Sequence, residues 1–190
     1  MKERKFGFVL GRFQPFHFGH QQIINEIILD GRIPVVLIGS TNQDRDLEKN
    51  PLSFDEREKM IKLVYPDVIC LDIPDTSSWD KWIEIILKEL GHQAKSCTLY
   101  YHNKEVDRYE EFKYAGVVYK NYFYTKIFEL LAEQGIIEGL KEIEFVGRTD
   151  INIDANARDI RHNFEDMKHL LDGRVYWYLK DLGIFDENSN

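Results

Sequence analysis

Hydrophobic and polar positions alternate along the first hundred residues in a way that predicts strands followed by helices. Apolar residues form short, nearly continuous runs, as expected of strands covered on both faces, and these runs are residues 6–10, 34–40, 67–73 and 96–101. Between them, isoleucines recur at helical spacing after residue 20, and Ser53 and Glu56 have the spacing of a capping box. The predicted helices of this half are residues 20–29, a segment that starts near 53, and residues 77–91.

The second half of the chain has a less regular pattern. Its segments are interpreted as a helix over 104–116, a strand over 117–124, a helix over 125–140, a strand over 143–148, and terminal helices over 154–173 and 174–185. Alternating strands and helices favour an α/β fold with a central parallel sheet, helices on both of its faces, and further helices at the C-terminus. Since no linker-like segment divides the chain, the sequence predicts a single domain, residues 1–190.

Composition and charge narrow the classes of partner. The formal net charge of −8 argues against general nucleic-acid binding, which favours a basic surface. No apolar run is long enough to span a membrane, and the first residues lack the apolar region of a signal peptide. Cys70 and Cys97 lie in apolar runs without a disulfide pattern, which predicts a reducing, cytoplasmic location. A small anionic ligand stays compatible with this charge, because a few local cations can offset an acidic exterior.

The loop after the first predicted strand concentrates cations and imidazoles. Gly11, Arg12, His17 and His20 fall between an apolar run and the next helix, where parallel sheets bind their ligands. Gly11 permits close approach of backbone to a ligand, Arg12 offers a planar fork, and His20 lies where free N–H groups favour an anion. The loop is therefore interpreted as a phosphate-binding site. A merely polar turn is one alternative; a zinc site at the two histidines is another, although further ligands are missing nearby.

The segment GRFQPFHFGH, residues 11–20, resembles the HxGH signature of the nucleotidyltransferase superfamily. In this longer form it resembles the archaeal-type nicotinamide mononucleotide adenylyltransferases. Three later segments are similar to motifs of the same family: IGS at 38–40, NPLSFDEREKM at 50–60 and DTSSWDKW at 75–82. NARDIRHN at 156–163 is the least faithful match, because Asn and Arg replace hydroxyl residues of the closing motif. The resemblance implies a Rossmann-like nucleotidyltransferase fold, in which residues 119–143 form an insertion.

The resemblance also implies roles for individual side chains. The implied catalytic residues are Arg12, His17, His20 and Arg161. The two histidines would bind the triphosphate and stabilise the reacting α-phosphate, and Arg161 would hold the leaving pyrophosphate. Arg57 matches an arginine that contacts substrate phosphate, and Trp79 matches the tryptophan that stacks on nicotinamide, whereas Trp82 is assigned to the core. The implied substrate-binding residues are Gly11, Phe13, Gln14, Gly19, Ser40, Asn50, Arg57, Trp79, Asn103, Asn156 and Arg158.

The implied reaction joins nicotinamide mononucleotide to the α-phosphate of ATP, giving NAD and pyrophosphate. The attacking group is already an ionised phosphate, so a strong general base is not required. Mg²⁺ is expected to arrive with ATP, and no metal ligand is expected from the protein. Two alternatives stay open. The acceptor could be another phosphate compound such as nicotinate mononucleotide, or the chain could be a non-catalytic module that senses ATP or NAD. A homo-oligomer is also left open.

Overall fold

A computed structural model describes residues 5–90, 97–102, 111–114, 117–120, 144–148 and 155–185; for residues 79, 80, 90, 97, 102, 111–114, 117–120 and 144–148 only the backbone is described. Within these ranges, no helix is both long enough and apolar enough to cross a membrane. The predicted helix over 125–140 and the site residue Asn103 lie outside the described residues, as does most of the 119–143 segment.

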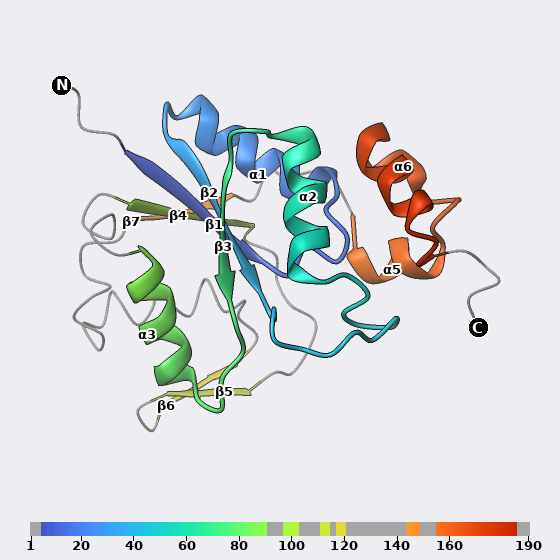
Figure 1. The fold of residues 1–190 in the computed structure, drawn as a ribbon. Helices are drawn as coiled ribbons and strands as arrows, with labels where there is room; N and C mark the ends of the chain where they lie inside the picture. Colours follow the sequence, from blue (N-terminus) through green and yellow to red (C-terminus); the bar gives the residue numbers. More distant parts are fainter. Residues whose placement is uncertain are drawn as a thin grey trace.

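Five parallel strands form the central sheet, in the order β3-β2-β1-β4-β7 (Figure 1). These strands are β1 Phe6–Gly11, β2 Ile33–Gly39, β3 Ile69–Ile73, β4 Cys97–His102 and β7 Glu144–Arg148. The chain builds outward from β1 to β3 and then crosses to the other side of β1 to form β4. The strand order therefore reverses beside β1, and the carboxyl ends next to that reversal are where open sheets of this kind bind ligands.

Helices cover both faces of the sheet (Figure 1). On one face lie α1 Phe18–Leu29 and α2 Phe54–Val64, and on the other lies α3 Trp79–Leu90. Side chains along β1 alternate between the two layers: Val9 belongs to the cluster that also holds Ile24 of α1 and Met60 of α2, whereas Phe8 is buried outside that cluster. Burial on both faces, which the continuous apolar runs predict, is confirmed.

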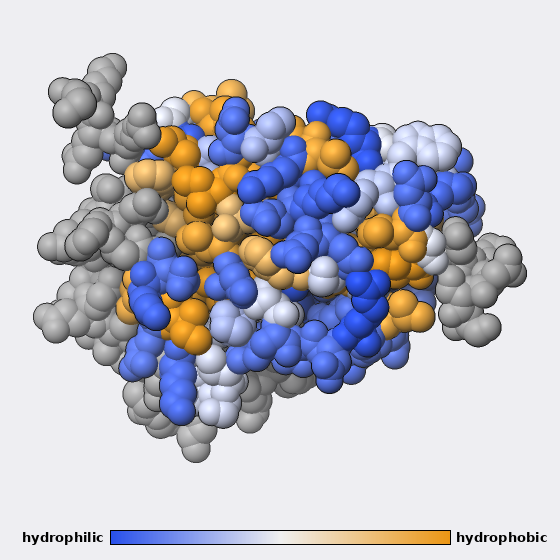
Figure 2. All heavy atoms as spheres, viewed as in Figure 1, coloured by the Kyte–Doolittle hydropathy of each residue, from blue (hydrophilic) through white to orange (hydrophobic). Residues whose placement is uncertain are grey.

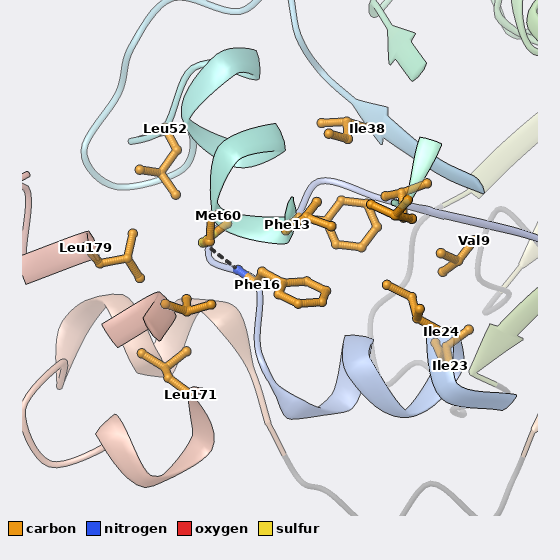
Figure 3. Packing of buried hydrophobic residues seen from close by; sticks show 14 of the residues in the cluster. Val9, Phe13, Phe16, Ile23, Ile24, Ile38, Leu52, Met60, Leu171 and Leu179 are labelled. Carbon is orange, nitrogen blue, oxygen red and sulfur yellow. Dashed lines mark hydrogen bonds between the residues drawn. The ribbon is translucent and has the colours of Figure 1, made fainter. Parts of the chain in front are cut away.

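The C-terminal elements pack against α2 at one end of the molecule (Figure 1). They are α5 Ala157–His162, a 3₁₀ turn at Lys168–Leu170, and α6 Gly173–Asp181. Figure 3 shows Leu171 and Leu179 of this part on the same side of the core as Met60 and Leu52. The backbone N–H of Phe16 donates to the Met60 sulfur at 3.4 Å, so the β1–α1 loop is fixed to α2 through the core.

Several local predictions are confirmed and two are wrong. Helix α2 begins with the predicted capping box, in which Ser53 and Glu56 each accept from the other's backbone N–H. The helix over 104–116 is wrong where the structure describes it, because residues 111–114 form β5, a strand antiparallel to β6 at Val117–Lys120. Pairing with a neighbouring strand outweighs the local helical pattern there.

The terminal helix over 154–173 is also wrong in its extent. Helix α5 ends at His162, and Asn163 follows it as the C-cap. Asn163 has φ −133° and ψ 51°, outside the helical region, so the helix stops there although the Asn163 N–H still donates to the Asp159 carbonyl. After this break, Phe164 and Leu171 are buried in the hydrophobic core.

Candidate active site

A pocket of about 520 Å³ opens at the carboxyl ends of the three strands β1, β2 and β3. It is lined by Leu10, Gly11, Arg12, Gly39, Ser40, Gln43, Asp75, Thr76, Ser77, Ser78 and Trp82. Leu10, Gly11 and Arg12 belong to the end of β1 and its loop, and Gly39, Ser40 and Gln43 belong to the end of β2 and its loop. The remaining residues follow β3 or lie on α3. Figure 2 shows that hydrophilic residues cover the molecular face over α2 and over the loop that follows β2. The pocket lies at the carboxyl ends of the strands, where open parallel sheets generally bind their ligands.

The two histidines lie at the N-terminus of α1. His17 is the N-cap, and its backbone N–H donates to Nδ1 of His20 at 3.3 Å. The two rings stack with centroids 3.7 Å apart, and the His20 ring also faces Phe16 at 5.8 Å and meets Phe13 edge-on at 4.8 Å. The aromatic residues of the loop therefore fix the imidazole of His20 in position, with its Nδ1 used as an acceptor.

Burial lowers the pKa of His20 well below its usual value, and the neighbouring charge of His17 lowers it further. The site therefore favours a neutral His20 imidazole in the absence of ligand. A polyanionic ligand placed here would oppose the lowered pKa, because its charge stabilises an imidazolium and its oxygens accept the ring N–H. The histidine pair is therefore suited to bind an anion together with a proton.

Small residues let the loop pack closely. A Cβ on Gly19 would lie 3.1 Å from the His17 ring and 3.9 Å from Cβ of Ala155. Gly19 thus leaves room for the His17 ring, whereas the contact to Ala155 is an ordinary one. A Cβ on Gly11 would lie 3.0 Å from the ring of Phe13, which itself adopts a positive φ of 53°. The predicted Gly11, Phe13 and Gly19 therefore shape the loop.

Three arginines gather between the histidine loop and α5. The pKa of Arg161 is lowered by burial first and then by the charges of Arg12 and Arg158. Its guanidinium donates to the carbonyls of Gln14 and Glu48, which fastens α5 to two loops. Mutual repulsion between like charges is relieved by an anion, so this cluster is suited to a polyphosphate.

Asn156 is the N-cap of α5, since its side chain accepts the backbone N–H of Arg158 at 2.9 Å. Gln14 is buried, and its amide exchanges two hydrogen bonds with the backbone of Leu52, at 2.9 and 3.0 Å. Asn50 closes a short turn through the hydrogen bond from its backbone N–H to Asp46. The described contacts of these three residues are with other parts of the protein.

Several of the predicted site residues form two groups. Gly11, Arg12 and Ser40 line the pocket. The histidines lie at the end of the β1–α1 loop and the start of α1, and Arg158 and Arg161 lie on α5, from which Arg161 donates to that loop. Arg12 belongs to both groups, because it lines the pocket and its charge reaches Arg161. Arg57 belongs to neither group, because its side chain is only 1% exposed and lies beneath the pocket.

Sequence reasoning missed the wall of the pocket that is formed by residues following β3. The carboxylate of Asp75 accepts from the Ser40 hydroxyl at 3.1 Å and from the Gln43 amide at 3.0 Å. The Asn42 side chain exchanges hydrogen bonds with the Asp75 backbone, at 3.0 and 2.8 Å. Asp75 follows the third predicted strand by only two residues, so its position at the carboxyl end of that strand was the available signal.

The tryptophans are placed differently from the prediction. Trp82 lines the pocket, so its assignment to the core is wrong. Ile83 and Ile86 do face the core, whereas Trp82, one residue before Ile83 on the same helix, faces the strand ends. Trp79 is the first residue of α3, and its side chain lies outside the described part. The stacking role given to Trp79 stays a prediction, as does the role of Asn103.

Comparisons with known proteins agree with this geometry. The family model described as Cytidylyltransferase-like matches residues 8–136, which is more than half of the chain. The chain is 28% identical over 160 residues to the nicotinamide/nicotinic acid mononucleotide adenylyltransferase of Acinetobacter baylyi, covering 71% of this chain and 84% of that protein. It is 28% identical over 162 residues to the nicotinamide-nucleotide adenylyltransferase of Methanosarcina barkeri, covering 74% and 90%.

Solved structures give the same fold. A bifunctional NMN adenylyltransferase/ADP ribose pyrophosphatase from Francisella tularensis superposes with a TM-score of 0.67 at 20% identity, covering 96% of this chain. The same kind of protein complexed with AMP and a manganese ion superposes with a TM-score of 0.66 at 19% identity. The chain spans about half the length of these two solved chains, 52% and 51%.

Proposed function

Because the chain belongs to the cytidylyltransferase-like family, we propose that it transfers the adenylyl group of ATP to nicotinamide mononucleotide, giving NAD and pyrophosphate. The observation that carries the proposal is the arrangement around Arg12. Arg12 lines a pocket with an indole and a carboxylate, its charge acts on Arg161 together with that of Arg158, and two stacked imidazoles follow in the same loop and the start of α1. Such a junction suits a reaction in which an acceptor in the pocket attacks a polyphosphate held by the loop. The names of the Acinetobacter and Methanosarcina relatives support the same activity.

The chemistry needs positioning and charge stabilisation more than proton transfer. The acceptor's phosphate oxygen attacks the α-phosphorus of ATP, and the bond from that phosphorus to the bridging oxygen of pyrophosphate breaks. His20 and His17 would donate to the oxygens on which charge accumulates, and Arg161 with Arg158 would hold the leaving pyrophosphate. Arg12, at the junction, would contact the acceptor phosphate or the α-phosphate. Catalysis of this kind depends on groups fixed before the reaction, as the stacked rings are.

The pocket is suited to the base of the acceptor. Trp82 offers an aromatic face, and Asp75 offers a carboxylate held by Ser40 and Gln43. A carboxylate in this position favours a carboxamide, which donates N–H, over a carboxylate ligand, which repels it. Nicotinate mononucleotide is the second candidate acceptor, since the name of the Acinetobacter relative includes nicotinic acid.

Mg²⁺ is the proposed metal, and it would come with the phosphates of ATP. Within the part of the chain that the structure describes, there is no group of three His, Cys, Asp or Glu side chains placed to hold a metal. A hard cation such as Mg²⁺ can be held mainly by phosphate and water oxygens, so the proposal assigns it no protein ligand. The proposal further treats residues 1–190 as one nucleotidyltransferase domain in the cytoplasm, in line with the absence of a disulfide pattern.

The test is pyrophosphate release from ATP and Mg²⁺ with each acceptor in turn. We expect release with nicotinamide mononucleotide, less with nicotinate mononucleotide, and background release without acceptor. A His20→Ala variant should lose the signal, whereas His169→Ala, which changes an exposed histidine of the 3₁₀ turn, should keep it. No release with either acceptor while ATP still binds would refute the proposal and favour a sensing module.

A further inference from the structure

Arg57 is the largest fully buried side chain among the described residues, with 1% of its surface exposed. It lies in the first turn of α2, and its described hydrogen bonds all go to backbone carbonyls. Nε donates to Ser53 at 3.1 Å, and one terminal nitrogen donates to Arg12 at 2.9 Å and to Gly39 at 2.7 Å. The other terminal nitrogen reaches the Ser40 carbonyl at 3.5 Å. One guanidinium thereby joins the end of β1, the end of β2 and the start of α2.

The carbonyls that Arg57 binds belong to the floor of the pocket. Arg12, Gly39 and Ser40 all line the pocket, whereas Arg57 does not. Ser40 also adopts a positive φ of 54°, a backbone conformation that side-chain-bearing residues seldom adopt without support. Arg57 thus lies under the backbone of residues that line the pocket, and its hydrogen bonds fix that backbone.

The charge of Arg57 is balanced by dipoles more than by ion pairs. Among the described residues, no carboxylate lies within ion-pair distance of it, and Asp72 and Asp75 act on it from farther away. Burial is the main cause that lowers its pKa to about 10, so the guanidinium stays protonated at neutral pH. Carbonyl oxygens at the carboxyl ends of parallel strands carry partial negative charge, which opposes a phosphate. Donation from Arg57 draws these oxygens down and away from the pocket.

We propose that Arg57 is a positioning residue that holds the carbonyls of Arg12, Gly39 and Ser40 beneath the pocket floor, so that two phosphate-bearing substrates can meet above it. It acts without touching either substrate, which differs from the substrate contact that the sequence motif predicts. Lysine cannot replace it, because an ammonium is a compact point charge and lacks the fork that spans three segments. The proposal rests on the proposed function for the identity of the substrates.

The first experiment compares Arg57→Lys with Val175→Ala, a core change in α6 that lowers thermal stability without approaching the pocket. Steady-state kinetics are measured for ATP and for nicotinamide mononucleotide at a temperature where both variants are folded. Arg57→Lys should raise KM for both substrates and lower kcat/KM about 100-fold, the scale of a displacement of about 1 Å in a site. Val175→Ala should leave both KM values unchanged.

Two kinetic results would overturn the proposal. A KM change for only one substrate, with kcat unchanged, would show direct contact with that substrate. Equal kinetic losses in Arg57→Lys and Val175→Ala would show that lost stability alone is responsible. Calorimetric binding of ATP to the same variants needs no turnover, so it separates a failure of this inference from a failure of the proposed reaction. Wild-type protein that binds ATP but never releases pyrophosphate refutes only the reaction.

A second measurement uses the wild-type protein and does not depend on how well the variants fold. In a crystal structure with pyrophosphate and nicotinamide mononucleotide bound, the Arg57 guanidinium should still donate to the carbonyls of Arg12 and Gly39. Its nitrogens should lie beyond hydrogen-bond distance from every phosphate oxygen. A guanidinium that has left these carbonyls to bind a phosphate would overturn the assignment.

Discussion

Replacing His20 is the most informative perturbation of the loop, because its ring is held from three sides. His20→Ala removes the donor proposed for the α-phosphate, together with ring contacts to His17 at 3.7 Å and Phe13 at 4.8 Å. Losing one preorganised donor to a transition-state oxyanion costs about 2.7–4 kcal/mol, which is a loss of about 100- to 1000-fold in kcat. Because the ring is already positioned by its neighbours, most of that loss should fall on kcat and little on the KM for ATP.

His20→Phe separates packing from chemistry. It keeps an aromatic ring against Phe13 and Phe16 but has no N–H to donate. Both His20 variants should therefore lose kcat to a similar extent, while His20→Phe keeps more of the thermal stability. The assay is initial-rate NAD formation at saturating ATP, with thermal melts on the same samples. The reasoning is refuted if either folded variant keeps kcat within threefold of wild type.

Other expected outcomes follow from single contacts. Trp82→Ala should raise KM for an aromatic acceptor by at least tenfold and leave KM for ATP nearly unchanged; equal effects on both would exclude a base-stacking role. Asp75→Asn should raise the ratio of kcat/KM for nicotinate mononucleotide over nicotinamide mononucleotide, measured in competition, and an unchanged ratio would remove Asp75 from specificity. The pKa of His20 is lower in the folded chain than in the unfolded chain. The contribution of His20 to the free energy of unfolding should therefore be fully present above pH 6.5 and fall as the pH drops below it. Urea midpoints for wild type and His20→Ala over pH 5–8 test this, and identical profiles would contradict it. Ser53→Ala should lower the free energy of unfolding by about 1 kcal/mol through the lost cap of α2, and no change in the urea midpoint would contradict that assignment.

Local patterns identified much of this fold because local physics determines it. The apolar runs of β1 and β2 predict strands buried on both faces, and the Ser53–Glu56 capping box marks the start of α2 to the residue. Helix α5 ends early because the backbone of Asn163 leaves the helical region, which a hydrophobic pattern does not reveal. Strand β5 depends on pairing with β6, which is information outside the segment itself.

The candidate site divides in the same way. The histidine loop could be found from sequence because its residues are contiguous and lie where a strand passes into a helix. The wall formed by Asp75 and Gln43 could not, because these residues meet only when β2 and β3 lie side by side. The burial of Arg57 was likewise invisible in sequence, since a charged residue in the first turn of a helix is usually exposed. Trp82 lines the pocket although the next residue, Ile83, is buried in the core, and a hydrophobic pattern does not reveal that difference.

The most direct test of the account follows labelled phosphorus through the reaction. Purified protein is incubated with nicotinamide mononucleotide, Mg²⁺ and ATP labelled at the α-phosphorus, and in a parallel sample with ATP labelled at the γ-phosphorus. We expect the α-label to appear in NAD and the γ-label in pyrophosphate, in equal amounts and only when the acceptor is present. A γ-label that moves to the acceptor, or an α-label that stays in ATP or AMP, would contradict adenylyl transfer.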